Sequence, residues 1–579
     1  MSQEGPPEVR DAKPSCRGSG KSWHELHRYR LFLAVSVGAY FAVSLTLSWL
    51  RYEELFTGNW DLGIFQQAFW ATAHGHPFYE AGDYEMSGIP SLFQVHPALL
   101  LLGLEGVYAV DPSPLALFAL QSLVVSTAAL PLYGIARDVT GSERGALYAA
   151  LLYLLWPPLL AANLYDFHLE SFLPLELFGF FWLWLRGRYG WGALAALTPT
   201  FTLQAGPVLV AAAAVFFCLY PEGLRNVRSQ PRRDRARDHI GAQGLLTALI
   251  RRGREPAFRA SILLLIEAFA SFLLLEYLGT HPSLLGLSPL LPSGVPPRPE
   301  VSQGLYVSLA HLGIDLPQKF GYWLALYALV GFLPFGEWRT QIMTLPWLGY
   351  TFVSYSVFTA GGNQYAFLPA FPIFLGVAYG LARFFPHAHS GTTIPPAPSR
   401  GGPHPDSPKG ERRAFLVPSR FLQRSRGDLL PVLIVALLLV GLALGPADPL
   451  WQGASLGPGY EVSYQPAPSD ARVFHLASLI PSNASVLASN NLFPYVADDL
   501  HAFALLWTPE IPPDLPFNAS HFPPYVFLCS SQGSSLPGWL AVLLANASVY
   551  GLRGQVTGTN QGTVSLFEQG YTGPVWEGD

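Results

Sequence analysis

The stretch LFLAVSVGAYFAVSLTLSWL, residues 31–50, has no charged side chain at any of its positions. A helix needs about 20 apolar residues to cross the hydrocarbon core of a bilayer. The run is too long for the apolar part of a signal peptide, and no small-residue cleavage site follows it. It therefore predicts a retained first membrane span, and the apolar runs that follow it decide the rest of the fold.

The whole chain shares this apolar character. Of 579 residues, 50% are hydrophobic and only 13% are charged, whereas soluble domains hold roughly 25% charged residues. We expect a mainly α, polytopic helical membrane protein that lies in the lipid bilayer and has no nucleic-acid partner. At about 20 residues a span, the sequence predicts about eleven spans, at 31–50, 114–135, 145–162, 170–186, 189–201, 204–220, 260–278, 320–336, 341–359, 364–385 and 429–446.

The basic residues predict which side each loop faces. Residues 1–30 carry six Lys or Arg, and short basic segments mark the cytoplasmic side of a membrane protein. With this N-terminal tail inside, all but five of the 34 basic residues fall in cytoplasmic segments; the five are Arg51, Arg298, Lys319, Arg472 and Arg553. The pattern predicts a multi-pass protein of the cell membrane with a cytoplasmic N-terminus.

Composition divides the remaining chain into two domains. Residues 31–446 form the predicted transmembrane domain, with basic cytoplasmic loops at 221–259 and 387–428. Residues 447–579 hold two basic residues and about ten acidic ones. Strand patterns at 485–488, 502–506, 525–529 and 563–567, with helix patterns at 470–479 and 537–544, predict a small extracytoplasmic α/β domain.

Three glycosylation sequons support this orientation. They begin at Asn483, Asn518 and Asn546, and all three follow the last predicted span. Such sequons mark exposed segments of exported domains, and eleven crossings from an inside start place the C-terminus outside. Chance occurrence of so short a motif is the alternative.

The stretch Gly58-Asn-Trp-Asp-Leu-Gly-Ile-Phe-Gln-Gln67 lies just beyond the first span. It places the carboxylate of Asp61 at the mouth of that span, and the amide of Gln67 and the imidazole of His96 follow. Polar groups packed just outside a span indicate a site on the non-cytoplasmic side. An interfacial belt, with the nearby aromatic rings at headgroup level, is the alternative, and the two interpretations are compatible.

A second polar cluster, Tyr165-Asp166-Phe167-His168-Leu169-Glu170, lies between the third and fourth spans on the same side. Two carboxylates and an imidazole at a membrane surface are costly unless they are paired, hydrated or bound to metal. Oxygen and imidazole ligands suit Mn²⁺ or Mg²⁺ better than a soft metal. We expect this turn to meet Asp61, with Asp61 and Asp166 as candidate metal ligands; helix capping by Asp166 is the alternative.

Further polar residues lie at or within later spans. Lys319, beside Tyr322, either reaches the headgroups or holds a lipid phosphate as a point charge. Asn363 opens the tenth span on the same side. Glu176 and Glu267 lie inside spans and are functional candidates, with structural pairing to a neighbouring helix as the alternative.

Several motifs together resemble an uncharacterised prokaryotic membrane family, domain of unknown function 2079. They are Asp61-Leu-Gly-Ile-Phe-Gln-Gln, His96-Pro97, Pro131-Leu-Tyr-Gly-Ile-Ala-Arg137, the 166–170 cluster, and the run from Ile480 to Pro494. That family in turn resembles the GT-C class of membrane glycosyltransferases, such as protein mannosyltransferases and aminoarabinose transferases, by analogy of fold.

The resemblance implies transfer of a sugar from a polyprenyl-phosphate carrier on the outer face of the membrane. GT-C enzymes use an acidic residue of the first outer loop as base or metal ligand, which is the place of Asp61. A second acidic site in the next outer loop matches Asp166 or Glu170. Such a reaction needs a base for the proton of the acceptor hydroxyl and cationic groups for the leaving phosphate.

The same resemblance places His168 and Lys319 at the phosphate and makes His96 a residue that shapes the pocket. The expected substrate-binding residues are His96, His168, Lys319, Tyr322, Asn363 and Gln67.

One segment departs from the family. The sixth span of the family opens with a basic residue followed by Glu-Asp, whereas here that place reads Thr202-Leu-Gln-Ala-Gly206. A non-catalytic membrane scaffold is therefore one alternative. A transporter or flippase for a lipid-linked or small solute is another, which the acids within spans favour. The lack of an internal repeat favours the enzyme over the transporter.

Overall fold

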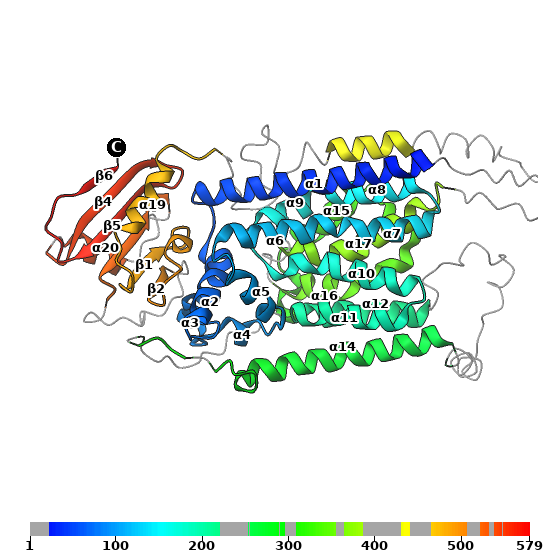
Figure 1. Cartoon of the computed structure of the whole chain (residues 1–579), viewed down its shortest axis with the longest axis horizontal. Coiled ribbons are helices and arrows are strands. Elements are labelled where there is room, and N and C mark those ends of the chain that lie inside the picture. The colour runs from blue at the N-terminus through cyan, green and yellow to red at the C-terminus, as the bar shows by residue number, and fades with distance from the viewer. Residues whose placement is uncertain are drawn as a thin grey trace, which may run out of the picture.

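The computed structural model describes residues 23–220, 255–288, 290–293, 308–354, 364–385, 430–440, 465–505, 522–531, 538–546 and 548–578, with residues 253 and 295. Over these ranges the protein is mainly helical, with a small sheet near its C-terminus. Figure 1 shows the helices side by side along the long axis and the sheet at one end of them. We call the end of the helical bundle next to the sheet the domain end.

The helices of the bundle follow the apolar runs of the sequence. α1 (Trp23–Glu53) and α14 (Pro256–Thr280) are long and keep apolar side chains such as Leu31 and Ile266 exposed, as expected for surfaces that face lipid. The other bundle helices are α6 (Pro114–Thr127), α7 (Ala129–Thr140), α8 (Glu143–Leu154), α9 (Pro157–Leu164), α10 (Leu173–Leu185), α11 (Tyr189–Thr202), α12 (Ala205–Leu219), α15 (Leu316–Ala328), α16 (Leu345–Val353) and α17 (Phe367–Leu381).

The expected number of about eleven spans is not confirmed. Among the described residues, four helices are long and apolar enough to cross a membrane: His27–Glu53, Pro114–Thr140, Pro256–Thr280 and Gln364–Leu381. The pair α8 and α9, bent by 45° at their junction, would make a fifth. Ala205–Leu219 and Leu430–Val440 are apolar but shorter.

Backbone breaks explain why apolar runs of the right length do not all become single long helices. The expected span 320–336 ends as α15 at Ala328, because Gly331 and Phe332 take positive φ angles of 60° and 53°. The chain then continues as the 3₁₀ segment η6 (Leu333–Thr344). Hydropathy counts apolar residues, and it does not register a turn made of apolar residues.

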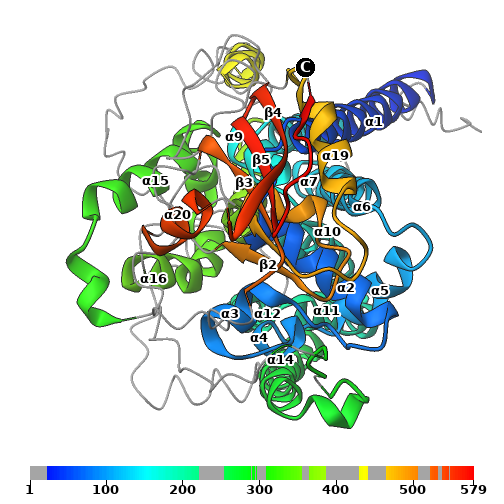
Figure 2. The same cartoon turned by 90° about the vertical axis from the view of Figure 1, so that its left-hand side faces the viewer.

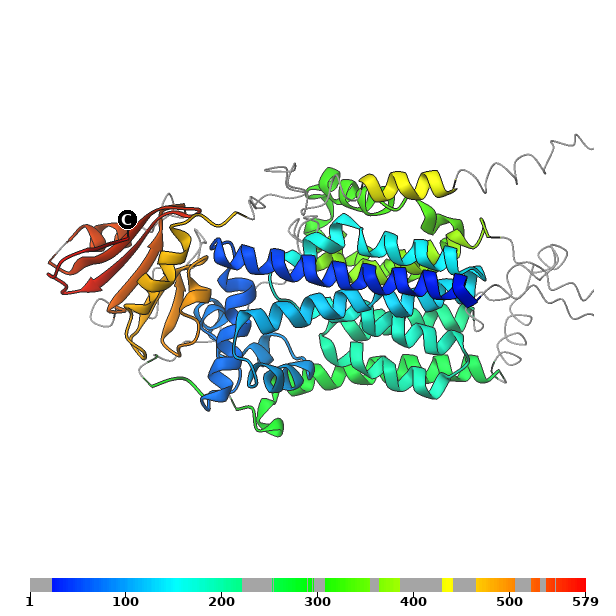
Figure 3. The same ribbon diagram turned by 45° about the horizontal axis from the view of Figure 1, so that its top comes forward.

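α17 is the central helix of the bundle. Every one of its residues is buried, and it contacts α7, α8, α10 and η6. Its glycines allow this close approach, because an added Cβ at Gly380 would lie 2.1 Å from the carbonyl oxygen of Leu333. Figure 3 shows the helix Leu430–Val440 on the outside of the bundle, and its residues Leu430 and Ile434 are buried against the same hydrophobic core.

The C-terminal domain is built on a six-stranded sheet with the strand order β2-β1-β3-β5-β4-β6. The strands are β1 (Val486–Ser489), β2 (Ala502–Leu505), β3 (Tyr525–Cys529), β4 (Tyr550–Thr559), β5 (Gly562–Gln569) and β6 (Trp576–Gly578). β1 pairs in parallel with β2 and β3, while β5 is antiparallel to β3 and β4. The strands expected from the sequence are present, and β4 and β6 were not expected.

Both faces of this sheet are covered. α19 (Asp470–Ser478) packs Val473 and Leu476 on one face. On the other face lie α20 (Gly538–Ala545) and, from the transmembrane part of the chain, α3 (Ala81–Ser87), which contributes Ala81 and Tyr84 to the same hydrophobic cluster. The sheet therefore uses part of the preceding domain as its second layer.

Polar and aromatic contacts fix the domain to the bundle. The ring of Tyr52, in the last turn of α1, lies 4.8 Å from the ring of Tyr495, whose hydroxyl donates to the backbone oxygen of Tyr52. Nε2 of Gln67 donates to the backbone oxygens of Asp499 and Ala502, at 2.9 and 3.0 Å. Figure 2, viewed from the sheet, shows the strands in front of the helix ends.

The sequons fall on the surface where they are described. Asn483 and Asn546 are both exposed, and Asn518 lies outside the described residues. Glycosylation at these asparagines stays a prediction.

The packing around α17 predicts the effect of adding one methyl group. Gly380→Ala should lower the free energy of unfolding by about 1–3 kcal/mol, because the methyl group overlaps the carbonyl of Leu333. Gly179→Ala in α10 is the matched control, since nothing lies within 4 Å of its Cβ position; it should be neutral or stabilising, because alanine favours helix. Thermal unfolding of the purified variants in detergent measures the difference. Equal midpoints for both variants would contradict the packing described for α17.

Candidate functional site at the domain end of the bundle

A cavity of about 390 Å³ opens at the domain end. Its wall is assembled from chain segments at the ends of helices: the segment after α1, the end of α4 (Leu92–Val95), the turn between α9 and α10, the break between α11 and α12, and η8 (Gln364–Ala366) just before α17. The lining residues are Asp61, Ile64, Phe65, His96, Tyr165, His168, Leu169, Glu170, Leu203, Gln364 and Tyr365.

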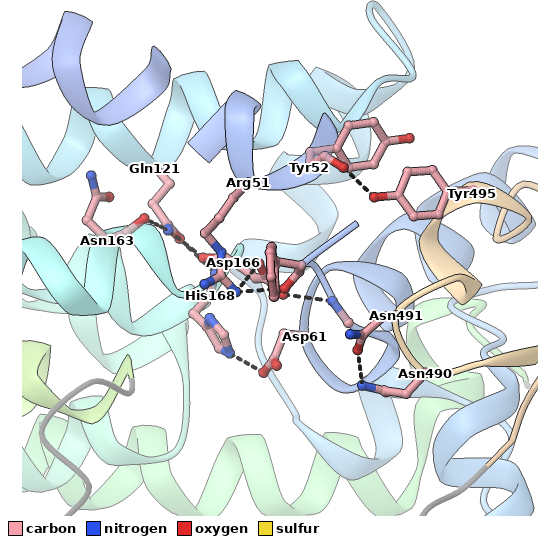
Figure 4. Close-up of polar contacts among 12 residues, drawn as sticks. Arg51, Tyr52, Asp61, Gln121, Asn163, Asp166, His168, Asn490, Asn491 and Tyr495 are labelled. Carbon is pink, nitrogen blue, oxygen red and sulfur yellow. Dashed lines mark hydrogen bonds and ion pairs between the residues drawn. The ribbon is translucent and has the colours of Figure 1, made fainter. Parts of the chain in front are cut away.

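Asp61 and His168 form the polar centre of this wall. Asp61 lies in the single π-helical turn η1 (Asn59–Gly63), and its Oδ1 is 2.7 Å from Nε2 of His168. The ring of His168 stacks on Tyr165 at 5.6 Å, and its side chain is only 6% exposed, against 16% for Asp61. Figure 4 shows the imidazole pointing at the carboxylate. Both side chains therefore lie on the cavity wall, and the imidazole holds the more exposed carboxylate.

The charge state of His168 follows from its surroundings. Burial lowers the pKa of the imidazole, but the charge and hydrogen bond of Asp61, together with the charges of Glu170 and Asp166, outweigh burial and leave the pKa of His168 raised. A proton on Nε2 is donated to Asp61 in either charge state, because an ionised carboxylate only accepts. His168 thus holds the Asp61 carboxylate in one orientation, as a hydrogen-bond donor whose protonated, cationic form is favoured.

Asp166 lies behind this pair and does not line the cavity. Its Oδ2 accepts the backbone N–H of Gly58 at 3.0 Å, and its Oδ1 lies 3.5 Å from Nη2 of Arg51. The same Nη2 donates to the backbone oxygen of Phe56 at 2.8 Å. Asp166 thereby ties the end of α1 and the start of the Asp61 loop to the turn that carries His168.

Asp166 also takes an uncommon backbone conformation. Its φ is 92°, in the left-handed region that residues with a side chain seldom adopt. Such strain persists where surrounding contacts enforce it, and it gathers at functional sites. Here the enforcing contacts are hydrogen bonds from Gln121 of α6.

Gln121 uses its whole amide to hold the turn. Its Nε2 donates to the backbone oxygens of Asn163 and Asp166, and its Oε1 accepts the backbone N–H of His168 at 2.8 Å. Gln121 is buried, so these bonds are shielded from water. One side chain therefore sets the positions of both Asp166 and His168, as Figure 4 shows.

The structure brings together four of the expected site residues. Asp61, His96, His168 and Glu170 line the same cavity, as expected from their predicted positions at one end of the spans. Asp166 supports them from behind.

The other expected substrate-binding residues lie elsewhere. Gln67 faces the C-terminal domain, and Oε1 of its amide accepts the N–H of Ala81. Lys319 is completely buried, and its Nζ donates to the backbone oxygens of His311 and Phe352, so it neither reaches headgroups nor lines the cavity. Tyr322 is buried and accepts the indole N–H of Trp347. Asn363 lies outside the described residues.

The residues present do not fit a divalent cation bound by Asp61 and Asp166. Among the described residues, no group of three or more His, Cys, Asp or Glu side chains is placed to hold a metal ion. The negative charge of Asp166 already faces Arg51, and that of Asp61 already faces His168.

Several residues of this site were not expected from the sequence. Arg51 was recognisable only as a basic residue on the wrong side of the positive-inside pattern, and Gln121 only as a polar residue inside a span. Neighbours of expected residues supply most of the remaining wall: Ile64, Phe65, Tyr165, Leu169, Leu203, Gln364 and Tyr365.

The burial of Asp166 predicts a pH effect on stability. Burial raises the pKa of this carboxyl to about 7, although Arg51 opposes the shift, while an unfolded chain has an Asp pKa of about 3.9. Between these values the folded state binds the extra proton, so the contribution of Asp166 to stability falls as pH rises from about 4 to about 7. Asp166→Asn mimics the protonated form and should remove this contribution.

The measurement is the difference in thermal midpoint between Asp166→Asn and wild type at several pH values. The thermal midpoint of the variant should rise relative to that of wild type as pH increases towards 7, and the difference between the two should stay constant above pH 7. A difference that does not change with pH, or that changes in the opposite direction, would refute the assignment.

Comparison with known proteins identifies the family of the chain. No curated protein matches its sequence. Among solved structures, the archaeal oligosaccharyltransferase AglB from Archaeoglobus fulgidus, in complex with an inhibitory peptide and a dolichol-phosphate, matches with 13% identity and a TM-score of 0.42, over 88% of this chain and 70% of that chain. The family described as predicted membrane protein (DUF2079) matches residues 51–510, which include every residue that lines the cavity. The chain therefore belongs to the DUF2079 family of predicted membrane proteins.

Proposed function

We propose that this protein is a membrane glycosyltransferase that moves a sugar from a polyprenyl-phosphate carrier to an acceptor hydroxyl. The observation that carries the proposal is the 2.7 Å contact between Asp61 and His168 at the wall of the cavity. It supplies a fixed carboxylate facing the cavity, which general-base catalysis requires.

The cavity offers groups suited to a sugar phosphate. The carboxylates of Asp61 and Glu170 can accept hydrogen bonds from sugar hydroxyls. Aromatic rings such as those of Tyr165 and Tyr365 suit the C–H side of a sugar ring. His96 is exposed on the wall and is the imidazole available to a phosphate oxygen. The pocket volume of about 390 Å³ lies in the usual range for small-ligand sites.

In the reaction, Asp61 takes the proton of the acceptor hydroxyl while the acceptor oxygen forms a bond to the sugar carbon. The bond between that carbon and the carrier phosphate breaks, and the polyprenyl phosphate leaves with its electron pair. His168 holds the carboxylate in place and offsets its negative charge before proton transfer. Arg51, Asp166 and Gln121 fix the two loops that carry the pair.

The position of the cavity favours transfer over transport. Transporters place their substrate sites near the middle of the membrane, whereas this cavity is formed at the domain end of the helices. Glu176, one of the two acids within spans that favour the transporter (the other is Glu267), accepts the hydroxyl of Thr202 at 2.9 Å with both carboxylate oxygens. This acid has the structural partner that a buried carboxylate needs.

The role of Asp61 gives a direct test. Asp61→Asn removes the base but keeps an acceptor oxygen for His168, so kcat should fall by about 10²–10⁴-fold while the thermal midpoint stays near that of wild type. Purified protein is assayed with a panel of polyprenyl-phosphate sugars, with EDTA and with added Mn²⁺. Asp111→Asn, an exposed carboxylate that does not line the cavity, is the control and should keep full activity.

Wild-type turnover by Asp61→Asn would rule out this role for Asp61. Lack of transfer by wild-type protein from every carrier sugar in the panel would count against the glycosyltransferase proposal as a whole.

We also propose that the domain end faces the outside of the cell and that the N-terminus lies in the cytoplasm. In a background without native cysteines, cysteine at exposed Ser478 of the C-terminal domain should react with a membrane-impermeant maleimide in intact cells. Cysteine at exposed Arg144, at the opposite end of the bundle, should react only after lysis. The reverse labelling pattern would invert the orientation.

A further inference from the structure

The Asp61 loop has a second support, which comes from the C-terminal domain. We infer that Phe493 of this domain is a positioning residue that holds the Asp61 loop against His168, so that the site is built from both domains. The inference deepens the proposed function and depends on it only where catalytic activity is the readout.

The strongest observation is the requirement for glycine at position 63. The backbone of Gly63 has φ −62° and ψ −44°, which any residue adopts in a helix. The need for glycine is therefore not conformational. A Cβ at this position would lie 2.6 Å from Cδ1 and 3.2 Å from Cε1 of Phe493, so the ring rests directly on the loop backbone two residues after Asp61.

A second contact lies on the other side of Asp61. An added Cβ at Gly58 would lie 3.0 Å from Nδ2 of Asn490. Figure 4 shows Asn490 and Asn491 beside the loop that bears Asp61. The glycines three residues before and two residues after Asp61 thus both meet the segment that follows β1.

The next turn of the same loop is tied by hydrogen bonds. Nε2 of Gln66 donates to Oδ1 of Asp498 at 3.3 Å, and the hydroxyl of Tyr108 donates to the same oxygen at 3.2 Å. Burial raises the pKa of Asp498, with Gln66 and Tyr108 opposing the shift. The C-terminal domain therefore contacts the loop on both sides of Asp61 and again one turn later.

Phe493 itself cannot move away easily. It is completely buried, begins the 3₁₀ segment η9 (Phe493–Tyr495), and belongs to the same hydrophobic cluster of the C-terminal domain as the strand residues Val486 and Phe527. A ring fixed on one side by a folded core can hold a flexible loop on the other side. Its loss leaves space beside Gly63, and the loop then samples positions in which Asp61 leaves His168.

Hydrogen exchange of the peptide 56–63 tests this inference without any enzyme assay. Its reporter is the Gly58 N–H, which donates to Asp166 only while the loop is in place. Phe493→Val should raise the exchange of this peptide by about ten- to a hundredfold, the range expected when a packed contact is lost. Phe527→Val is the matched control, because it makes the same change in the same core away from the loop.

A double substitution separates positioning from general loss of stability. Gly63→Ala alone should raise exchange of the same peptide, because its methyl group overlaps the Phe493 ring. Gly63→Ala combined with Phe493→Val should restore exchange towards the wild-type value, since valine has no δ carbon to collide with the methyl group. Two substitutions that are each harmful and together tolerated would establish the contact.

The activity arm uses the same variants. A misplacement of about 1 Å can cost 10²-fold in rate, so Phe493→Val and Gly63→Ala should each lower kcat by about that factor, and the double variant should recover most of it. Equal exchange of peptide 56–63 in Phe493→Val and Phe527→Val, or no rescue in the double variant, would overturn the inference. If exchange responds as expected but no sugar transfer is detected in wild type, the positioning stands and the proposed reaction fails.

Discussion

The site depends on the pairing of charges where water is scarce. Asp166 is buried at the end of the bundle, and a buried carboxylate is costly unless cations and hydrogen-bond donors surround it. Arg51 and the Gly58 N–H provide them. Because those partners lie in the last turn of α1 and in the segment after it, satisfying one carboxylate brings together two parts of the chain more than a hundred residues apart in sequence. The same contacts place the second carboxylate, that of Asp61, next to His168.

In this arrangement Asp61 and Asp166 have different roles, although the sequence suggests the same role for both. Asp61 and Asp166 are both acids next to a predicted span, and both were expected to act in chemistry. In the structure only Asp61 faces the cavity, while Asp166 holds the scaffold. Asp166, with its φ of 92°, has its carboxylate at Arg51 of α1 and at the Gly58 N–H. A carboxylate engaged by Arg51 is a poor metal ligand, so the same geometry disfavours a shared cation between the two acids.

The sequence could predict what depends on local pattern. Apolar length and low charge predicted a helical membrane protein, and strand patterns predicted four of the described strands of the C-terminal domain. The shared end of the predicted spans correctly brought Asp61 towards His168.

The sequence could not predict contacts that only the folded chain creates. Lys319 looked like a residue at the membrane surface, but the carbonyls of His311 and Phe352 meet its ammonium in the interior. Gln67 looked like a ligand contact, but its partners come from a domain more than four hundred residues later. The number of spans was not confirmed for a similar reason, since turns such as the one at Phe332 are themselves apolar.

The burial of α17 has a consequence for biogenesis. Its contacting elements, α7, α8, α10 and η6, all precede it in the chain, so the groove that receives it can be complete before the ribosome has made it. A nascent chain stopped just short of Phe367 would expose the apolar surfaces of these elements that α17 covers in the folded protein.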